Sequence, residues 1–186
     1  EWFDLSGINK GASRMDFEKL AFINGEHLHR LDDATALDLL LENAQKEHTL
    51  SDAAKSRIEA AIAVLKTRGQ TIPEITSASQ FLIIERPIDI NSKARKKLKP
   101  QALEILGDLR NALNDEETWT SDQLETLIQQ FCDTRELSLG QVGPQLRTAL
   151  TGGLPAPDLH LILFWLGKAE SIGRIDDVLE LMNTNI

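Results

Sequence analysis

The chain has 186 residues, 41% of them hydrophobic, which is enough apolar surface for one packed domain or two small ones. Its 29 acidic residues outnumber 20 Lys and Arg and give a formal net charge of -9 at pH 7, which opposes binding to a phosphate backbone. The longest apolar run, at residues 159–166, is far shorter than the ~20 residues of a membrane span, so we expect no membrane contact.

Helix signals recur from the start of the chain, and strand signals hardly appear. Asp16 precedes a short apolar face, and the pair Asn24-Gly25 predicts the end of this first helix. Asp32 or Asp33 then caps a second helix over residues 34–43.

The third predicted helix has the clearest boundaries. Ser51 caps a long Ala-rich stretch, and Gly69 follows as a natural stop. After this glycine, Pro73 suits the first turn of a fourth helix.

Two prolines mark the middle of the chain. A break follows at Arg86-Pro87, and a helix restarts at Asn91 or Ser92 through a basic stretch. Pro100 predicts a second break or kink, because proline removes a backbone donor and clashes with the preceding turn. Further helices are predicted over residues 102–113, from Thr120-Ser121-Asp122 onward, and at about 140–150, 157–167 and 170–182.

This pattern predicts an all-α fold of two small helical subdomains. The charged stretch between Pro87 and Pro100 separates two apolar-periodic regions, so we place a boundary near residue 90. The expected organisation is a leading segment at 1–30, a first subdomain at 31–90 and a second at 91–186.

Motifs for catalysis are missing from the sequence. It contains no G-x-G-x-x-G, no G-x-x-x-x-G-K-[ST], no H-E-x-x-H and no C-x-x-C. Cys132 is the only cysteine, which excludes an internal disulfide and, without a Cys/His cluster, argues against a zinc site. We expect no catalytic, cofactor or metal residue. Residues 1–5 lack an initiator methionine and signal-peptide features, so we expect a piece of a longer cytoplasmic protein.

One stretch carries a family resemblance. Residues 139–151 read L-G-Q-V-G-P-Q-L-R-T-A-L-T, Gly152-Gly153 follow, and the next apolar run ends in Leu166-Gly167-Lys168. This pattern resembles the C-terminal anticodon-binding region of bacterial glutamyl-tRNA synthetases, which are class I aminoacyl-tRNA synthetases. At the front, residues 8–25 resemble the family element just beyond the catalytic portion, with Phe22 where tryptophan is usual.

The resemblance implies an anticodon-binding helical cage whose partner is tRNA(Glu). The parent enzyme would ligate glutamate to that tRNA with ATP and Mg, whereas this chain lacks the H-x-G-H-like and K-M-S-K-S-like signatures and should be inactive alone. We expect a monomer. Residues 1–30 would end a segment that contacts the tRNA stem, where Lys19 meets a phosphate or a groove edge. The alternative for Lys19 is a solvated helix face.

Arg68 is the sharpest functional residue that the resemblance implies. The family has an arginine at the end of a comparable long helix, where it reads the third anticodon base, the C that separates tRNA(Glu) from tRNA(Gln). A guanidinium offers fixed donors to the acceptor edge of an unpaired base. The alternative is that Arg68 complements the negative C-terminus of its helix.

Arg147, Pro157 and Leu159 match family positions around the first two anticodon bases. Ala156 departs from a hydroxyl-bearing residue expected in some relatives. Arg147 has an intramolecular ion pair as its alternative. Further basic groups gather at Arg57, Lys66 and residues 93–99, and the latter run is either a solvated face or a surface that steers tRNA.

Two other functions remain open at this point. The net charge of -9, the absence of tyrosine and the few other aromatics favour an acidic, all-helical protein-interaction module that does not bind RNA. Within the family, some synthetases charge tRNA(Gln) as well or instead, and Arg68 favours the glutamate-only type.

Overall fold

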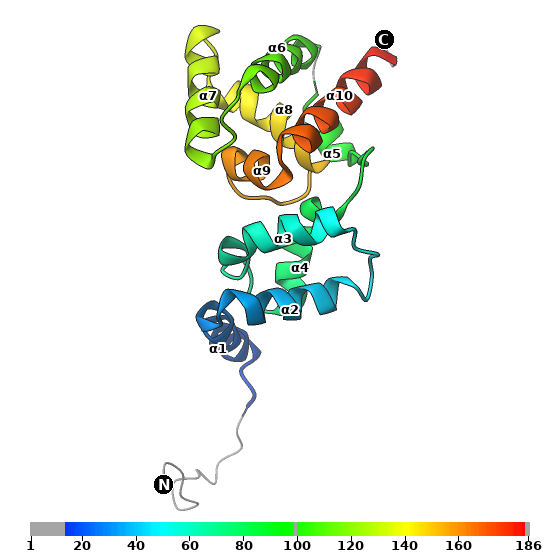
Figure 1. Ribbon diagram of the computed structural model, residues 1–186. Helices are drawn as coiled ribbons and strands as arrows, with labels where there is room; N and C mark the ends of the chain where they lie inside the picture. The colour runs from blue at the N-terminus through cyan, green and yellow to red at the C-terminus, as the bar shows by residue number, and fades with distance from the viewer. Residues whose placement is uncertain (1–13, 99, 185–186) are drawn as a thin grey trace, which may run out of the picture.

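The computed structural model describes residues 14–98 and 100–184, which contain ten helices and no strand (Figure 1). The predicted all-α fold is therefore confirmed. Residues 1–13 of the predicted stem-contact segment, and Lys99 of the basic run, lie outside this range. The helices are α1 (Phe17–Arg30), α2 (Asp33–Ala44), α3 (Asp52–Leu65), α4 (Ile72–Ile83), α5 (Ser92–Arg95), α6 (Gln101–Asp115), α7 (Ser121–Thr134), α8 (Leu139–Thr151), α9 (Leu159–Leu166) and α10 (Lys168–Thr184).

The helices form two groups, one above the other in Figure 1. In the lower group α2, α3 and α4 pack against one another, and in the upper group α10 packs on α6, α8 and α9 while α7 packs on α9. Contacts between α3 and α9 join the groups, and the buried apolar side chains form one continuous cluster that includes Ile58 and Leu163. The predicted boundary near residue 90 lies in the stretch between α4 and α5.

Side-chain caps explain where most helices begin. In each case an oxygen of the residue before the helix accepts a hydrogen bond from the backbone N–H three residues later, which satisfies one of the free donors of the first turn. The predicted starts are confirmed at Asp16, Asp32, Ser51, Asn91 and Thr120. Pro73 is in the first turn of α4, and Pro100 separates α5 from α6, as predicted.

The prediction that Asn24-Gly25 ends the first helix is wrong, because α1 continues to Arg30. Gly25 is buried inside the helix, and a Cβ atom there would lie 3.3 Å from the Cα of Gln70. Asn24 also donates a hydrogen bond from its side chain to the carbonyl of Gln70. The glycine is thus explained by the close approach of α1 to the turn that follows α3.

Gly69 likewise does not stop α3, which ends earlier at Leu65. A Cβ atom at Gly69 would lie 2.9 Å from the Cβ of Glu74 and 3.1 Å from the backbone nitrogen of Ile75. The residue is small because the turn folds back tightly onto the start of α4.

The pair Gly152-Gly153 ends α8 in a left-handed turn, with φ angles of 65° and 91°. The carbonyl of Gly152 accepts a hydrogen bond of 3.0 Å from the backbone N–H of Asn91. A Cβ atom would lie 2.3 Å from the carbonyl oxygen of Asp89 at the first glycine, and 2.5 Å from the Cβ of Ala94 at the second. The two glycines therefore allow the α5 segment to pack directly against the end of α8.

We expect Gly152→Ala to lower the free energy of unfolding by about 2–3 kcal/mol, because the substitution adds positive-φ strain to a backbone clash. Gly107→Ala is the matched control, since Gly107 lies inside α6 with nothing within 4 Å of an added Cβ. This control should gain up to about 1 kcal/mol from helix propensity. Urea denaturation measures both. Equal effects of the two substitutions on the free energy of unfolding would show that Gly152 is not required for the packing of the α5 segment.

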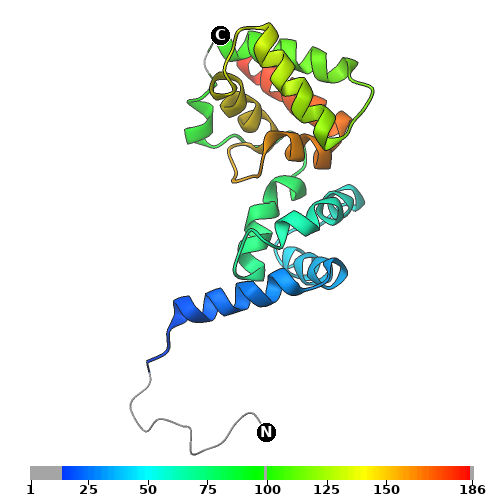
Figure 2. The same cartoon turned by 90° about the vertical axis from the view of Figure 1, so that its left-hand side faces the viewer.

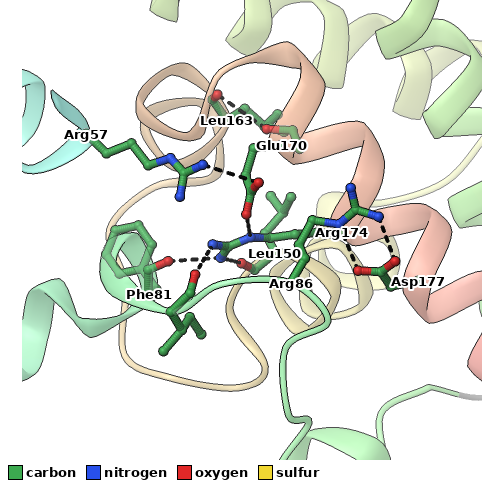
Figure 3. A network of polar contacts seen from close by, with 10 residues as sticks. Arg57, Phe81, Arg86, Leu150, Leu163, Glu170, Arg174 and Asp177 are labelled. Carbon is green, nitrogen blue, oxygen red and sulfur yellow. Dashed lines mark hydrogen bonds and ion pairs between the residues drawn. The ribbon is translucent and has the colours of Figure 1, made fainter. Parts of the chain in front are cut away.

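A buried arginine joins the two groups of helices (Figure 3). Arg174 of α10 is 0% exposed. Its guanidinium donates hydrogen bonds of 2.9 Å and 2.8 Å to the carbonyls of Phe81 and Ile84 at the end of α4. It donates a third, of 2.6 Å, to the carbonyl of Leu150 in α8, and its Nε donates to Glu170 at 2.7 Å.

The charges around Arg174 extend this junction. Burial lowers the pKa of Arg174, and the hydrogen bond to Glu170 opposes that shift. Glu170 also pairs at 3.2 Å with Arg57 of α3, so a carboxylate of the upper group binds cations from both groups. Beside it, Arg86 makes two hydrogen bonds, of 2.8 Å and 2.7 Å, to Asp177 (Figure 3). The basic group at Arg57 is thus engaged inside the protein.

Arg174→Met should lower the free energy of unfolding by about 3–5 kcal/mol, since it strands three carbonyls and part of a buried carboxylate. Arg110→Met is the control. Arg110 of α6 forms a partly exposed ion pair with Asp176, which lies in α10 as Arg174 does. Exposed pairs contribute little, so this control should leave the urea midpoint nearly unchanged. A small effect of the Arg174 substitution would show that the junction does not stabilise the fold.

Candidate nucleic-acid interface

Arg68 lies in the turn between α3 and α4. Its backbone N–H donates to the carbonyl of Leu65 at 2.9 Å, and its side chain is exposed. Within the described part of the chain this side chain has no ion pair or hydrogen bond. Its neighbour Lys66 differs, because its ammonium binds Asp33 and the carbonyl of Leu31, both at 2.7 Å. Of the basic groups at this helix end, Arg68 is the one available to a ligand.

Arg147 of α8 is half-buried and holds the loop that leads into α9. Its Nη1 donates to the carbonyls of Ala156 at 2.8 Å and Pro157 at 2.5 Å. These partners are carbonyls rather than a carboxylate. Burial lowers the pKa of Arg147, the charge of Arg68 lowers it further, and Asp158 raises it. The two arginines, one from each group of helices, are therefore close enough to repel each other.

A hollow of about 450 Å³ opens beside Arg147. Leu159, the first residue of α9, is 8% exposed and lines it with an apolar side chain. Gly143 also lines the hollow, and a Cβ atom there would be in ordinary contact with the Cδ1 of Leu159, at 3.4 Å. Pro157 is buried and contributes its carbonyl to Arg147. The lining residues are Lys97, Glu125, Ile128, Gln129, Leu139, Gly143, Pro144, Arg147, Asp158, Leu159 and His160.

The structure brings together Arg68, Arg147 and the start of α9, but it places Lys19 elsewhere. Lys19 is an exposed residue of the first turn of α1, and its side chain has no hydrogen bond or ion pair with any residue that the structure describes. Figure 2 shows α1 projecting from the lower group, away from the loop before α9. Lys19 is joined to the Arg68 turn only through its own helix, by way of Gly25 and Gln70.

His160 and Lys97 also line the hollow, and neither was among the predicted binding residues. A signal for His160 exists in the sequence, because it is a polar residue within the apolar run of α9. No local signal distinguishes Lys97 from the other cations of the basic run, since its position depends on how the α5 segment packs on α8.

Arg147→Gln should release the loop before α9, because one guanidinium nitrogen binds both of its carbonyls. We expect faster amide hydrogen exchange at residues 152–158 and a loss of about 1–3 kcal/mol. Arg68→Gln should alter neither, since Arg68 has no partner to lose within the described residues. Unchanged exchange in the Arg147 variant would contradict this role.

The fold defined by these helices is that of a known all-helical region of tRNA ligases. It matches a solved structure of a glutamate tRNA ligase from Elizabethkingia meningosepticum with a TM-score of 0.81 and 24% identity, over 96% of this chain and 35% of that one. The family model described as the anticodon binding domain matches residues 29–179, so the chain belongs to this family.

Relatives with higher identity agree with this assignment. Glutamate–tRNA ligase 1 of Hyphomonas neptunium is 41% identical over 177 residues, which are 95% of this chain and 36% of that protein. Glutamate–tRNA ligase 2 of Zymomonas mobilis is 35% identical over 187 residues, which cover 100% of this chain and 39% of that protein. The chain thus spans less than two fifths of the length of these relatives.

The described residues contain neither a helix that could span a membrane nor a cluster of metal-ligating side chains. None of the helices within residues 14–98 and 100–184 has the length and apolarity needed to cross a bilayer. Within the same ranges, no three His, Cys, Asp or Glu side chains gather as metal ligands would.

Proposed function

We propose that this chain is the anticodon-binding part of a glutamate–tRNA ligase, and that Arg68 reads the third anticodon base of tRNA(Glu). The observation that supports this most is that Arg68 is exposed, has no partner among the described residues, and lowers the pKa of Arg147 in the other helix group by charge repulsion. Two cations that act on each other attract an anionic ligand, and Asp158, which raises the pKa of Arg147, offsets part of their charge. A guanidinium supplies donors for both a base edge and the adjacent phosphate.

The surroundings suit unpaired bases. The Nη1 of Arg147 donates hydrogen bonds to the carbonyls of the loop before α9. In our proposal Arg147 therefore shapes the site and adds positive charge. Leu159 offers an apolar surface for the face of a base, and Pro157 fixes the entry to α9. Specific RNA recognition commonly splays single-stranded bases into such sites, which compensates for the lack of a broad aromatic platform here.

The remaining parts of the proposal concern the longer protein. Lys19 would contact a phosphate of the tRNA stem, because it is an exposed cation on a helix joined to the Arg68 turn. ATP and Mg would act in the part of the ligase that this chain does not span. A monomeric, cytoplasmic enzyme is the form that we propose.

The test compares two anticodon-loop RNA hairpins that differ only at the third anticodon position, C for tRNA(Glu) and G for tRNA(Gln). We expect the chain to prefer C by roughly tenfold or more, as one good set of base contacts supplies about 1–3 kcal/mol. Affinity should fall steeply with salt. Arg68→Gln should abolish the preference, as measured by fluorescence anisotropy.

Lys46→Gln serves as the matched control, because Lys46 is an exposed cation at the far end of α2. It should keep the preference for C. A preference for G in the unaltered chain would favour the tRNA(Gln)-charging type. Failure to bind either hairpin at low salt would instead support the acidic protein-interaction module.

A further inference from the structure

Four cations in and after α5 are exposed: Lys93, Arg95, Lys96 and Lys97, here called the basic segment. Within the described residues, none of their side chains has an ion pair or a hydrogen bond. Eight other cations of the described residues pair with carboxylates, whereas Lys19, Lys46 and Arg68 do not; the paired ones are Arg30, Lys55, Arg57, Lys66, Arg86, Arg110, Arg135 and Arg174. The basic segment is a run of neighbouring cations without an ion pair in a chain whose net charge is -9.

The basic segment borders a second hollow, of about 600 Å³, at the starts of α6 and α8. The described residues that line this hollow include no carboxylate. They are Lys96, Lys97, Gln101, Ile105, Gly140, Gln141, Pro144 and Gln145. Lys97 and Pro144 also line the hollow that contains Arg147. Lys97 thus borders both hollows, of which the second has no acid in its lining, whereas Glu125 and Asp158 line the one that contains Arg147.

The position of the basic segment is fixed by the end of α8. Asn91 accepts a hydrogen bond of 2.8 Å from the backbone N–H of Ala94, and its own N–H binds the carbonyl of Gly152. Ala94 is 3% exposed and packs on Gly153. Arg147 lies one turn before the end of α8. The packing of the basic segment on that end therefore fixes its position relative to the proposed decoding site.

We propose that the basic segment binds phosphate groups of the RNA strand that flanks the bases read at Arg68 and Arg147. This proposal rests on the function proposed above, since it concerns the same RNA. Figure 2 shows α5 projecting from the upper group on the side to which α1 projects from the lower one, so a strand running along this side meets both. Screening limits charge interactions to about 8–10 Å in physiological salt, so distant acids do not cancel a local cationic surface.

The experiment compares the double variant K96Q/K97Q with the unaltered chain on the tRNA(Glu) hairpin over a range of salt. Each phosphate contact to a single strand contributes about 0.7 to the slope of log affinity against log salt. Loss of two contacts should therefore lower the slope by about 1.4 and weaken binding roughly 10- to 30-fold near 0.1 M salt. The preference for C over G should stay, because phosphate contacts carry no base information.

K46Q/K55Q is the control, with the same charge change at the opposite end of α3 from Arg68, where Lys46 follows α2 and Lys55, in the first turn of α3, pairs with Asp52. It should leave the slope unchanged. The proposal is overturned if K96Q/K97Q keeps the original affinity and slope, or if the control loses as much. If either result is found while Arg68→Gln still removes the preference for C, the phosphate-binding role of the basic segment is disproved and the base-reading role of Arg68 stands. A chain that binds no RNA overturns both proposals.

Discussion

The buried guanidinium of Arg174 is the interaction on which the arrangement of the two helix groups depends. A charge removed from water is costly unless hydrogen bonds replace its hydration. Here those partners come from both groups, with Phe81 and Ile84 on one side and Leu150 and Glu170 on the other. The charge can be satisfied only when the groups are docked in this orientation. The distance between Arg68 and Arg147 is set by the same docking, because each belongs to a different group.

The distribution of charge reconciles an acidic chain with an RNA partner. Arg57 and Lys66 form ion pairs with Glu170 and Asp33 of the same chain and are engaged by them. Arg68 and Lys97 have no acid of their own within the described residues. Net charge therefore describes solubility and average repulsion, whereas binding depends on which cations remain unpaired and where they face.

Much of the fold was predictable from sequence, because caps and apolar periodicity are local signals. Asp32, Ser51 and Asn91 begin their helices as their side-chain oxygens predict. Gly25 and Gly69 were assigned to helix ends from composition, but both are required by contacts with residues distant in space, which a local pattern does not contain. Arg174 escaped prediction for the same reason, since its three carbonyl partners come from two other helices. The proximity of Arg68 to Arg147 likewise arises only from the docking of the two groups.

The close contact between Gly25 and Gln70 places α1 against the turn that carries Arg68. The side chain of Asn24 donates a hydrogen bond to the carbonyl of Gln70, two positions beyond Arg68. The backbone of this turn is therefore held from two sides, by α1 at Gln70 and by α3 through the carbonyl of Leu65. The backbone position of Arg68 is thus set by two helices, whereas its exposed side chain is free to adjust to a ligand.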